Sequence, residues 1–403
     1  MDLKSGYPFW AVKNGLMSVF PRLESNTTCD VLIVGAGITG ALIARSLSKK
    51  GFDVVVAEER DVAWGSTAAS TALLQYEIDT PMVDLAKKYG EETAALLYRS
   101  CADAIPLLGK IAREVRDVDF EMKQSLYIAS SRFHVAGLRE EFDMRRKHGL
   151  PVTWLSKAET TERFGIQAPG ALLTDVAAQV DPYRLTSRLL DRLKNNGVRI
   201  FDRTRVDWVQ SRTRGVLART QTGVVIRAKH LVFATGYASQ KWLREKVASN
   251  RSSYAFVTDP IGAKKLGPWS KTLLWESARP YIYSRSTADG RLLVGGEDDQ
   301  IDIPARRDAR VEKKVGILLK RARKLFPKLD LDPTFAWGGT FAETPDGLPY
   351  FGAHPEWGAR VMFAMGYGGN GITYSALGAD VLAATLKGKA HKLSGPFAFS
   401  RIK

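Results

Sequence analysis

The chain has 403 residues, 45% hydrophobic and 25% charged, which is the balance of a globular protein with one large or two ordinary domains. No apolar run approaches the roughly 20 residues of a membrane-spanning helix, and residues 1–26 lack the pattern of a signal peptide, so a cytoplasmic location is expected. Two cysteines and five scattered histidines indicate neither a disulfide framework nor a metal site.

The net charge of +16 leaves two interpretations of the surface open. A solvated basic surface is the simpler one, because lysines and arginines are spread along the chain. The other is an anionic partner, such as an acidic electron acceptor or a membrane surface. No nucleic-acid motif accompanies the basic residues, so no nucleic acid is expected. The sequence does not predict the oligomeric state.

The first regular elements predict a βαβ unit. An aromatic N-terminal segment, with Tyr7, Phe9 and Trp10, precedes it and is expected to pack on the body of the fold. An apolar strand at 30–34 leads through a glycine turn into a helix at 38–50, and a second apolar strand follows at 54–58. This order opens a doubly wound parallel sheet.

The rest of the chain divides into two kinds of pattern. Residues 81–115 are mostly helical with an expected break at Pro106, and residues 253–296 alternate as in an antiparallel sheet. The other expected elements are helices at 135–148, 184–196, 311–326 and 372–386 and strands at 125–129, 199–201, 205–210, 216–220, 224–228 and 230–234. We therefore expect an α/β fold with a discontinuous Rossmann-type cofactor domain (1–80, 150–240 and 335–403) and a mixed antiparallel-sheet α+β substrate domain (81–149 and 241–334).

The turn after the first strand is Gly35-Ala36-Gly37-Ile38-Thr39-Gly40. Gly35 permits the tight turn, Gly37 lets the backbone approach a pyrophosphate, and Gly40 lets the helix pack closely on the sheet. The helix N-terminus then offers N–H groups and a positive dipole end to phosphates. The turn predicts a dinucleotide.

An acid at the end of the second strand supports that prediction. Glu58 stands 18 residues beyond Gly40, where a carboxylate is expected to bind ribose hydroxyls. Glu59 takes this role if the strand is out of register, and Arg60 is a possible neighbour of the adenine.

Three later segments distinguish FAD from NAD. They are Gln179 to Leu185, Leu231-Val232-Phe233-Ala234-Thr235-Gly236, and Thr344 to Gly352 followed by Gly366-Tyr367-Gly368-Gly369-Asn370-Gly371-Ile372. Together they resemble the D-amino-acid oxidase superfamily of FAD-dependent oxidoreductases, which includes glycine, sarcosine and gamma-glutamylputrescine oxidases. The resemblance covers about residues 30–388 and implies a glutathione-reductase-like flavoprotein fold.

The resemblance also implies roles for matching residues. Val206 would contact the adenine, and Ala234, Thr235 and Gly236 would pass beside the AMP half. The segment with Gly366, Gly368, Gly369, Asn370, Gly371 and Ile372 would lie along the isoalloxazine, where a helix N-terminus stabilises the reduced ring. A small-residue loop with Gly65, Ser66, Thr67, Ser70, Thr71 and Ala72 would face the flavin. That loop departs from the Gly-Arg-Asn-Gly-Gly type of the putrescine-linked oxidases, which weakens any transfer of their substrate.

Some relatives hold flavin covalently through a cysteine or a histidine. Here no cysteine lies in the C-terminal flavin segment, and no histidine lies between residues 35 and 80. We therefore expect non-covalent FAD.

Candidates for the substrate side come from two segments. Tyr281, Tyr283 and Arg285 share one face of a strand, and Arg285 is a candidate clamp for a carboxylate. Tyr76 and Glu77 follow the small-residue loop, and Glu77 would favour a cationic amine. Other aromatic residues are candidates for a wall of the cavity: Tyr254, Trp275, Trp337 and Tyr367.

Three functions remain open at this point. The leading one is oxidation of a small amine or amino acid by hydride transfer to flavin N5, with oxygen or another acceptor reoxidising the flavin. The second is a 2-hydroxy-acid dehydrogenase of the same fold that passes electrons to a quinone or a protein. The third is a flavin-stabilised assembly protein without turnover.

Overall fold

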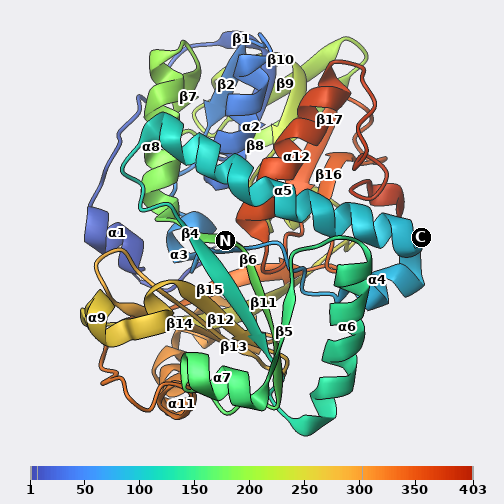
Figure 1. The fold of residues 1–403 in the computed structure, drawn as a ribbon. Coiled ribbons are helices and arrows are strands. Elements are labelled where there is room, and N and C mark those ends of the chain that lie inside the picture. Colours follow the sequence, from blue (N-terminus) through green and yellow to red (C-terminus); the bar gives the residue numbers. More distant parts are fainter. Residues whose placement is uncertain (1, 7, 302, 402–403) are drawn as a thin grey trace.

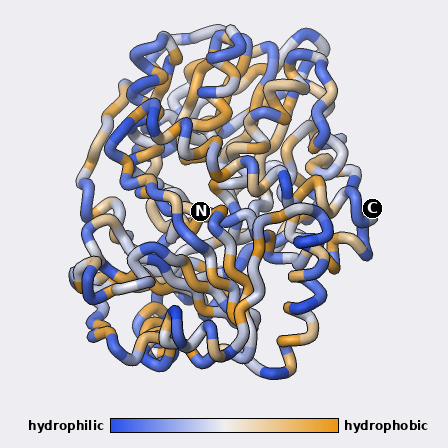
Figure 2. Tube along the Cα trace, viewed as in Figure 1, coloured by the Kyte–Doolittle hydropathy of each residue, from blue (hydrophilic) through white to orange (hydrophobic). Residues whose placement is uncertain are grey.

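The protein is described by a computed structural model that covers residues 2–6, 8–301 and 303–401. Two sheets dominate it, one in the upper and one in the lower half of Figure 1. Figure 2 shows hydrophobic residues gathered along the inner strands and hydrophilic residues on the peripheral helices. Within the described residues, no helix is both long and apolar enough to cross a membrane.

The strands of the first sheet are β1 (Thr27–Val34), β2 (Val54–Ala57), β7 (Arg199–Phe201), β8 (Val206–Arg212), β9 (Gly215–Thr220), β10 (Val225–Phe233), β16 (Tyr350–Ala353) and β17 (Val361–Met365). Their order is β16-β17-β10-β1-β2-β7, with β8 and β9 attached through β10. β1 pairs in parallel with β2 and β10, which confirms the predicted βαβ opening. The strands expected at 224–228 and 230–234 form one continuous β10, because no turn residue separates them.

The helices around this sheet are α2 (Ile38–Lys49), α4 (Met82–Tyr89), α5 (Glu91–Val115), α8 (Pro182–Asn195) and α12 (Gly371–Leu386). α2 packs against both α8 and α12, and α5 crosses the same layer (Figure 1). The break expected at Pro106 is wrong, because α5 continues through it and the helical segment divides at Gly90 instead. Pro106 is exposed, so its ring lies on the solvent side of the helix, where a proline is tolerated.

The strands of the second sheet are β3 (Leu73–Gln75), β4 (Glu121–Ile128), β5 (Thr153–Ser156), β6 (Gly170–Gln179), β11 (Ser249–Thr258), β12 (Thr272–Glu276), β13 (Ile282–Ser286), β14 (Leu292–Asp299) and β15 (Pro333–Glu343). Their order is β15-β11-β14-β13-β12-β4-β6-β3, with β5 on β6. The antiparallel pairing expected over 253–296 joins β11, β14, β13 and β12, whereas β12 pairs in parallel with β4.

The remaining helices connect or cover these layers. α11 packs on the second sheet and contributes to its core. The bounds are α1 (Phe9–Asn14), α3 (Ser66–Ala69), α6 (Val135–Lys147), α7 (Lys157–Phe164), α9 (Ala263–Leu266), α10 (Pro304–Asp308) and α11 (Val311–Leu325), with 3-10 turns η1 (Arg132–His134), η2 (Gly236–Trp242), η3 (Gly267–Ser270) and η4 (Phe399–Arg401).

Sheet membership differs from the expected ranges for four strands. β3, β5, β6 and β15 were expected with the cofactor domain but belong to the second sheet. α5 was expected with the substrate domain but shares its hydrophobic core with α2 and α12. The functional division of the chain between cofactor and substrate stays a prediction.

The aromatic N-terminal segment packs between the layers. Phe9 and Trp10 are buried, and Trp10 Nε1 donates a hydrogen bond to Ser70 O at 2.7 Å. Tyr7 lies outside the described residues.

Candidate active site

A long cavity lies between the two sheets. Both sheets contribute to its lining, for example Ala57 and Ala234 from the first and Ala255 and Trp337 from the second. All the residues expected to contact a cofactor line it except Gly40 and Gly366: Gly35, Gly37, Ile38, Thr39, Glu58, Glu59, Arg60, Gly65, Ser66, Thr67, Ser70, Thr71, Ala72, Val206, Ala234, Thr235, Gly236, Gly368, Gly369, Asn370, Gly371 and Ile372. We call the part around Gly35–Thr39 and Glu58 the glycine-loop end.

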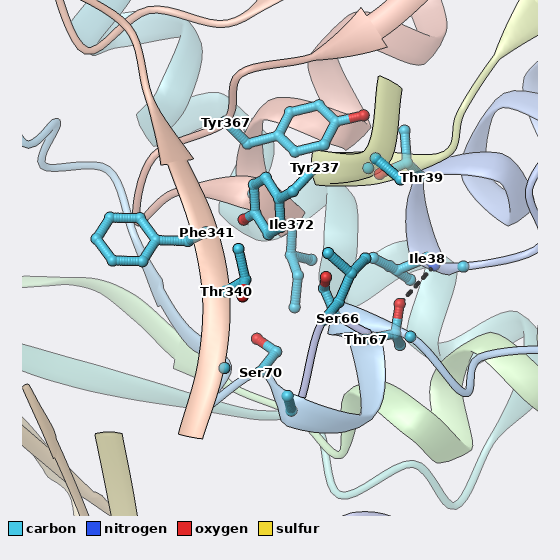
Figure 3. Close-up of a pocket in the computed structure, with 18 of the residues that line it drawn as sticks. Ile38, Thr39, Ser66, Thr67, Ser70, Tyr237, Thr340, Phe341, Tyr367 and Ile372 are labelled. Atoms are coloured by element: carbon cyan, nitrogen blue, oxygen red, sulfur yellow. Dashed lines mark hydrogen bonds between the residues drawn. The ribbon is translucent and has the colours of Figure 1, made fainter. Parts of the chain in front are cut away.

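The glycine-loop end is held by close backbone contacts. Gly35 has φ of 110°, and a Cβ there would lie 2.4 Å from Ala234 O. A Cβ at Gly40 would lie 1.9 Å from Gly35 O, so this glycine lets α2 approach the turn although it does not line the cavity. The N-cap of α2 is Gly37, which has no side chain to cap the helix. Thr67 Oγ1 accepts a hydrogen bond from Ile38 N at 3.0 Å (Figure 3). The start of α2 therefore presents N–H groups to the cavity.

Glu58 is fixed by the backbone on both sides. Its Oε2 accepts from Ala36 N at 2.8 Å and its Oε1 from Arg60 N at 3.0 Å. Burial raises the pKa of this carboxyl above its ordinary value, against the two backbone hydrogen bonds. The carboxyl thus ties the glycine turn to the end of β2 while facing the cavity.

The small-residue loop forms one wall of the cavity. Figure 3 shows Ser66, Thr67 and Ser70 facing the same space as Thr340 of β15. Ser66 Oγ is buried and makes no hydrogen bond within the described residues. A buried polar atom without a partner indicates a missing ligand, which fits the phosphate or ring oxygens of FAD.

In the C-terminal glycine segment, some backbone N–H groups donate hydrogen bonds within the protein and others face the cavity. Gly368 N donates to Ala342 O at 2.9 Å, and Gly369 N donates to Asp79 Oδ2 at 2.8 Å. α12 begins at Gly371 without a side-chain cap, so its first N–H groups face the cavity from Gly371 to Thr373. Gly366 lies outside the lining and packs against Thr344 instead.

The second sheet contributes an aromatic face. Trp275 pairs across strands with Tyr127 and Tyr283, and its ring stacks on Tyr127 at 3.7 Å between centroids. Gly295 makes room for the Tyr283 ring, because a Cβ there would lie 2.4 Å from that ring. We call the part lined by Trp275, Tyr281 and Tyr283 the aromatic end. All four residues of the predicted aromatic wall line the cavity: Tyr254, Trp275, Trp337 and Tyr367.

The segment after β3 alternates between cavity and core. Gln75, Glu77 and Asp79 line the cavity, as expected for an extended chain. Tyr76 points the other way, so its prediction as a substrate-contacting residue does not fit the structure: it is fully buried against Tyr98, at 6.2 Å between ring centroids. Asp79 was not predicted, although the same alternation would have indicated it.

Glu77 belongs to a buried ion triad. Arg145 of α6 lies 2.7 Å from Glu141 and 3.5 Å from Glu77, and all three side chains are buried. Glu141 also accepts hydrogen bonds from the first N–H groups of α4, whereas Glu77 Oε2 has no partner within the described residues. Burial raises the pKa of Glu77, and Arg145 opposes that shift.

Arg285 does not lie where a carboxylate clamp requires it. It is 2% exposed and outside the cavity lining. Its guanidinium donates to Thr71 O at 2.6 Å and to Val180 O at 3.0 Å, and it lies over the Trp10 ring at 4.9 Å. These contacts occupy the guanidinium, so the predicted role of Arg285 as a carboxylate clamp does not fit its position in the structure. Tyr283, one alternation earlier on β13, lines the cavity as expected.

The cavity lining bears on how a flavin is held. None of the described residues that line it is a cysteine or a histidine, and Cys29 and Cys101 are buried elsewhere.

Comparisons with known proteins agree with this geometry. The family model described as FAD dependent oxidoreductase matches residues 30–385. Gamma-glutamylputrescine oxidoreductase of Escherichia coli is 27% identical over 95% of this chain and 89% of its own, and glycine oxidase of Geobacillus kaustophilus is 28% identical over 92% and 97%.

Solved structures of similar fold include the glycine oxidase from Geobacillus kaustophilus, with a TM-score of 0.78 at 23% identity over 93% of this chain and 99% of that one. The L-amino acid deaminase from Proteus myxofaciens has a TM-score of 0.78 at 16% identity over 100% and 98%. At these identities they show the fold alone. Because the family match spans most of the chain and the cavity fits the cofactor, the protein belongs to the FAD-dependent oxidoreductase family and is an FAD-dependent oxidoreductase.

Proposed function

We propose that this protein oxidises the CH–NH bond of a small amine or amino acid, with FAD held non-covalently along the cavity. The observation that carries the proposal is the cavity itself, which runs from the glycine-loop end to the aromatic end. The relatives named for gamma-glutamylputrescine and for glycine support a nitrogen-bearing substrate.

At the glycine-loop end, the chain holds the nucleotide. The N–H groups at the start of α2 would bind the pyrophosphate, and Glu58 would accept hydrogen bonds from ribose hydroxyls. Val206 and Ala234 line the cavity beside the adenosine.

At the aromatic end, the chain positions the substrate. When bound, FAD supplies the acceptor for a hydride equivalent. Trp275 and Tyr283 would cover the substrate and exclude water, and the first N–H groups of α12 would stabilise negative charge on the reduced flavin. The reacting nitrogen must be neutral, so that its lone pair forms the imine as the hydride leaves.

Substrate class is tested by anaerobic mixing of the holoprotein with amines, amino acids and 2-hydroxy acids. We expect at least one amine or amino acid to bleach the flavin absorbance. Bleaching by 2-hydroxy acids alone would contradict the proposal and support the dehydrogenase alternative. No bleaching by any of them would support a non-catalytic role.

Three parts of the proposal have separate tests. Acid denaturation is expected to release all the flavin, and colour in the protein pellet would contradict non-covalent binding. Peroxide formation with and without an added acceptor shows whether oxygen, or instead an acidic protein or a membrane quinone, reoxidises the flavin. Cell fractionation tests the proposed cytoplasmic location.

A further inference from the structure

We propose that the aromatic end selects an amine that carries a second positive charge and no carboxylate, and that Asp79 and Glu77 hold that second charge. This inference rests on the proposed function and names its substrate class.

The cavity wall carries negative charge without a paired cation. Asp79 lines the cavity and has no ion pair within the described residues, and its carboxylate accepts a hydrogen bond from Gly369 N at 2.8 Å. Glu77 and Glu141 are two carboxyl groups that face the single cation Arg145, at 3.5 and 2.7 Å. The chain as a whole is strongly basic, which makes an acidic pocket wall the more unusual.

The buried oxygen of Glu77 gives independent evidence of a ligand. Glu77 is 3% exposed and lines the cavity, yet its Oε2 has no hydrogen-bond partner among the described residues. An unpartnered buried carboxylate oxygen is costly unless a donor or a cation satisfies it. A substrate ammonium supplies both.

A third carboxylate lies behind the aromatic rings. Asp298 of β14 has a buried oxygen, Oδ1, without a partner in the described part of the chain. Burial raises the pKa values of Tyr281 and Tyr283, and the negative charge of Asp298 raises both as well. Aromatic faces next to carboxylates favour organic cations, because ring faces and acids both attract positive charge.

Among the residues that the structure describes, no buried cation at this end is placed to hold a carboxylate. Among the described residues that line the cavity, the cationic ones are Arg60, which follows Glu58, and Lys241, whose ammonium lies over Trp242 of η2 at 5.4 Å. Arg285 is occupied by backbone carbonyls. Arg279 is exposed and lies over the Tyr281 ring at 4.7 Å, outside the lining. Trp275 Nε1 is an unpartnered donor, but it is uncharged.

The charge of each substrate nitrogen determines which of them the carboxylates bind. A nearby carboxylate stabilises an ammonium and raises its pKa, whereas the reacting nitrogen must be neutral. Asp79 and Glu77 therefore suit a cation that stays charged throughout the reaction, which a diamine provides and a monoamine does not.

The test compares pentylamine, 1,5-diaminopentane and 5-aminopentanoate, which share a chain and differ at the far end. We expect kcat/KM for flavin reduction to be about tenfold higher for the diamine than for pentylamine, and lowest for the amino acid. Asp79→Asn should remove the preference for the diamine, measured as the ratio of kcat/KM for the diamine to that for pentylamine, so that a general loss of rate does not count as support. Asp207→Asn, at an exposed position of β8, is the matched control and should change neither.

A binding measurement separates this inference from the proposed function. Pentyltrimethylammonium cannot be oxidised as an amine, and hexanoate is its anionic counterpart. Tryptophan fluorescence of the holoprotein should report binding of the cation at least about tenfold tighter than the anion, and Asp79→Asn and Glu77→Gln should each weaken it.

Two outcomes overturn the inference. One is equal or tighter binding of hexanoate. The other is faster turnover of 5-aminopentanoate than of the diamine, lost in Arg279→Ala. That result would mean that Arg279 binds a substrate carboxylate. If cation binding is found but no amine bleaches the flavin, the charge selection stands and the proposed function fails.

Discussion

The two ends of the cavity recognise their ligands by different means. At the glycine-loop end, N–H groups and close backbone contacts at Gly35 and Gly40 leave little room for change. At the aromatic end, the lining includes the rings of Trp275, Tyr281 and Tyr283, and the side chains of Glu77 and Asp79 line the same cavity. Recognition by the backbone preserves one cofactor, whereas recognition by side chains can be altered one residue at a time. We therefore propose that the aromatic end determines the choice of substrate.

The largest expected effect breaks the charge arrangement beside the aromatic end. Arg145→Met leaves Glu77 and Glu141 buried without a counterion, and we expect a loss of about 3–5 kcal/mol in the free energy of unfolding. Urea denaturation of the holoprotein measures it. Arg146→Met, the exposed neighbour on α6, should stay within about 0.5 kcal/mol.

The double variant Arg145→Met with Glu77→Gln sharpens this result. Removing one of the uncompensated charges should recover part of the lost stability, since the two substitutions act on one interaction. A single-variant loss no larger than that of Arg146→Met would contradict a buried triad.

A smaller effect is expected from overpacking at the glycine-loop end. Gly40→Ala places a Cβ 1.9 Å from Gly35 O, so α2 must move away from the turn. We expect a loss of about 1–3 kcal/mol in stability together with weaker FAD retention after gel filtration. Gly137→Ala on α6 has nothing within 4 Å of its Cβ and should instead stabilise by about 0.5–1 kcal/mol. Normal FAD retention in Gly40→Ala would show that the turn does not need this close approach.

The glycine-loop end was predictable because its signals are local in the sequence. The strand, the glycines and Glu58 follow one another within one βαβ unit, and all of them meet in the structure. The aromatic end depends on the pairing of β12 with β4 and β13, which the sequence does not indicate.

Arg285 and Asp79 show what local patterns miss. Alternation placed Arg285 on the same face as Tyr283, but it could not show that Thr71 and Val180 cover that part of the face. The same alternation beyond Glu77 leads to Asp79, whose significance depends on its contact with Gly369, 290 residues away.

A third prediction tests which acidic side chain, Glu58 or Glu59, binds the ribose hydroxyls. Glu58→Gln keeps one acceptor oxygen but turns an amide toward one of the two backbone N–H groups that the carboxylate now satisfies. We expect the Kd of FAD for the apoprotein to rise by about tenfold, measured by flavin fluorescence. Glu59→Gln should change it by less than about twofold. The reverse order would assign the ribose to Glu59.

The smallest expected effect concerns the charge of the aromatic end near neutral pH. Burial, together with the charges of Asp79 and Glu343, raises the pKa of Asp298 from 3.8 to about 7. Ser253 and Arg279 oppose this shift. Between these values the folded protein holds a proton that the unfolded chain has lost, so this contribution to stability is present at low pH and declines as pH rises toward 7.

Asp298 is partly exposed, so we expect the decline to be only about 1 kcal/mol. Subtracting the stability profile of Asp298→Asn from that of the wild type isolates the contribution of Asp298 from those of the other titrating groups. Binding of pentyltrimethylammonium should strengthen over the same interval, because Asp298 then gains its negative charge behind Tyr281 and Tyr283. Parallel stability profiles with an unchanged cation affinity would mean that Asp298 is ionised throughout, and that the aromatic end is already fully acidic below pH 7.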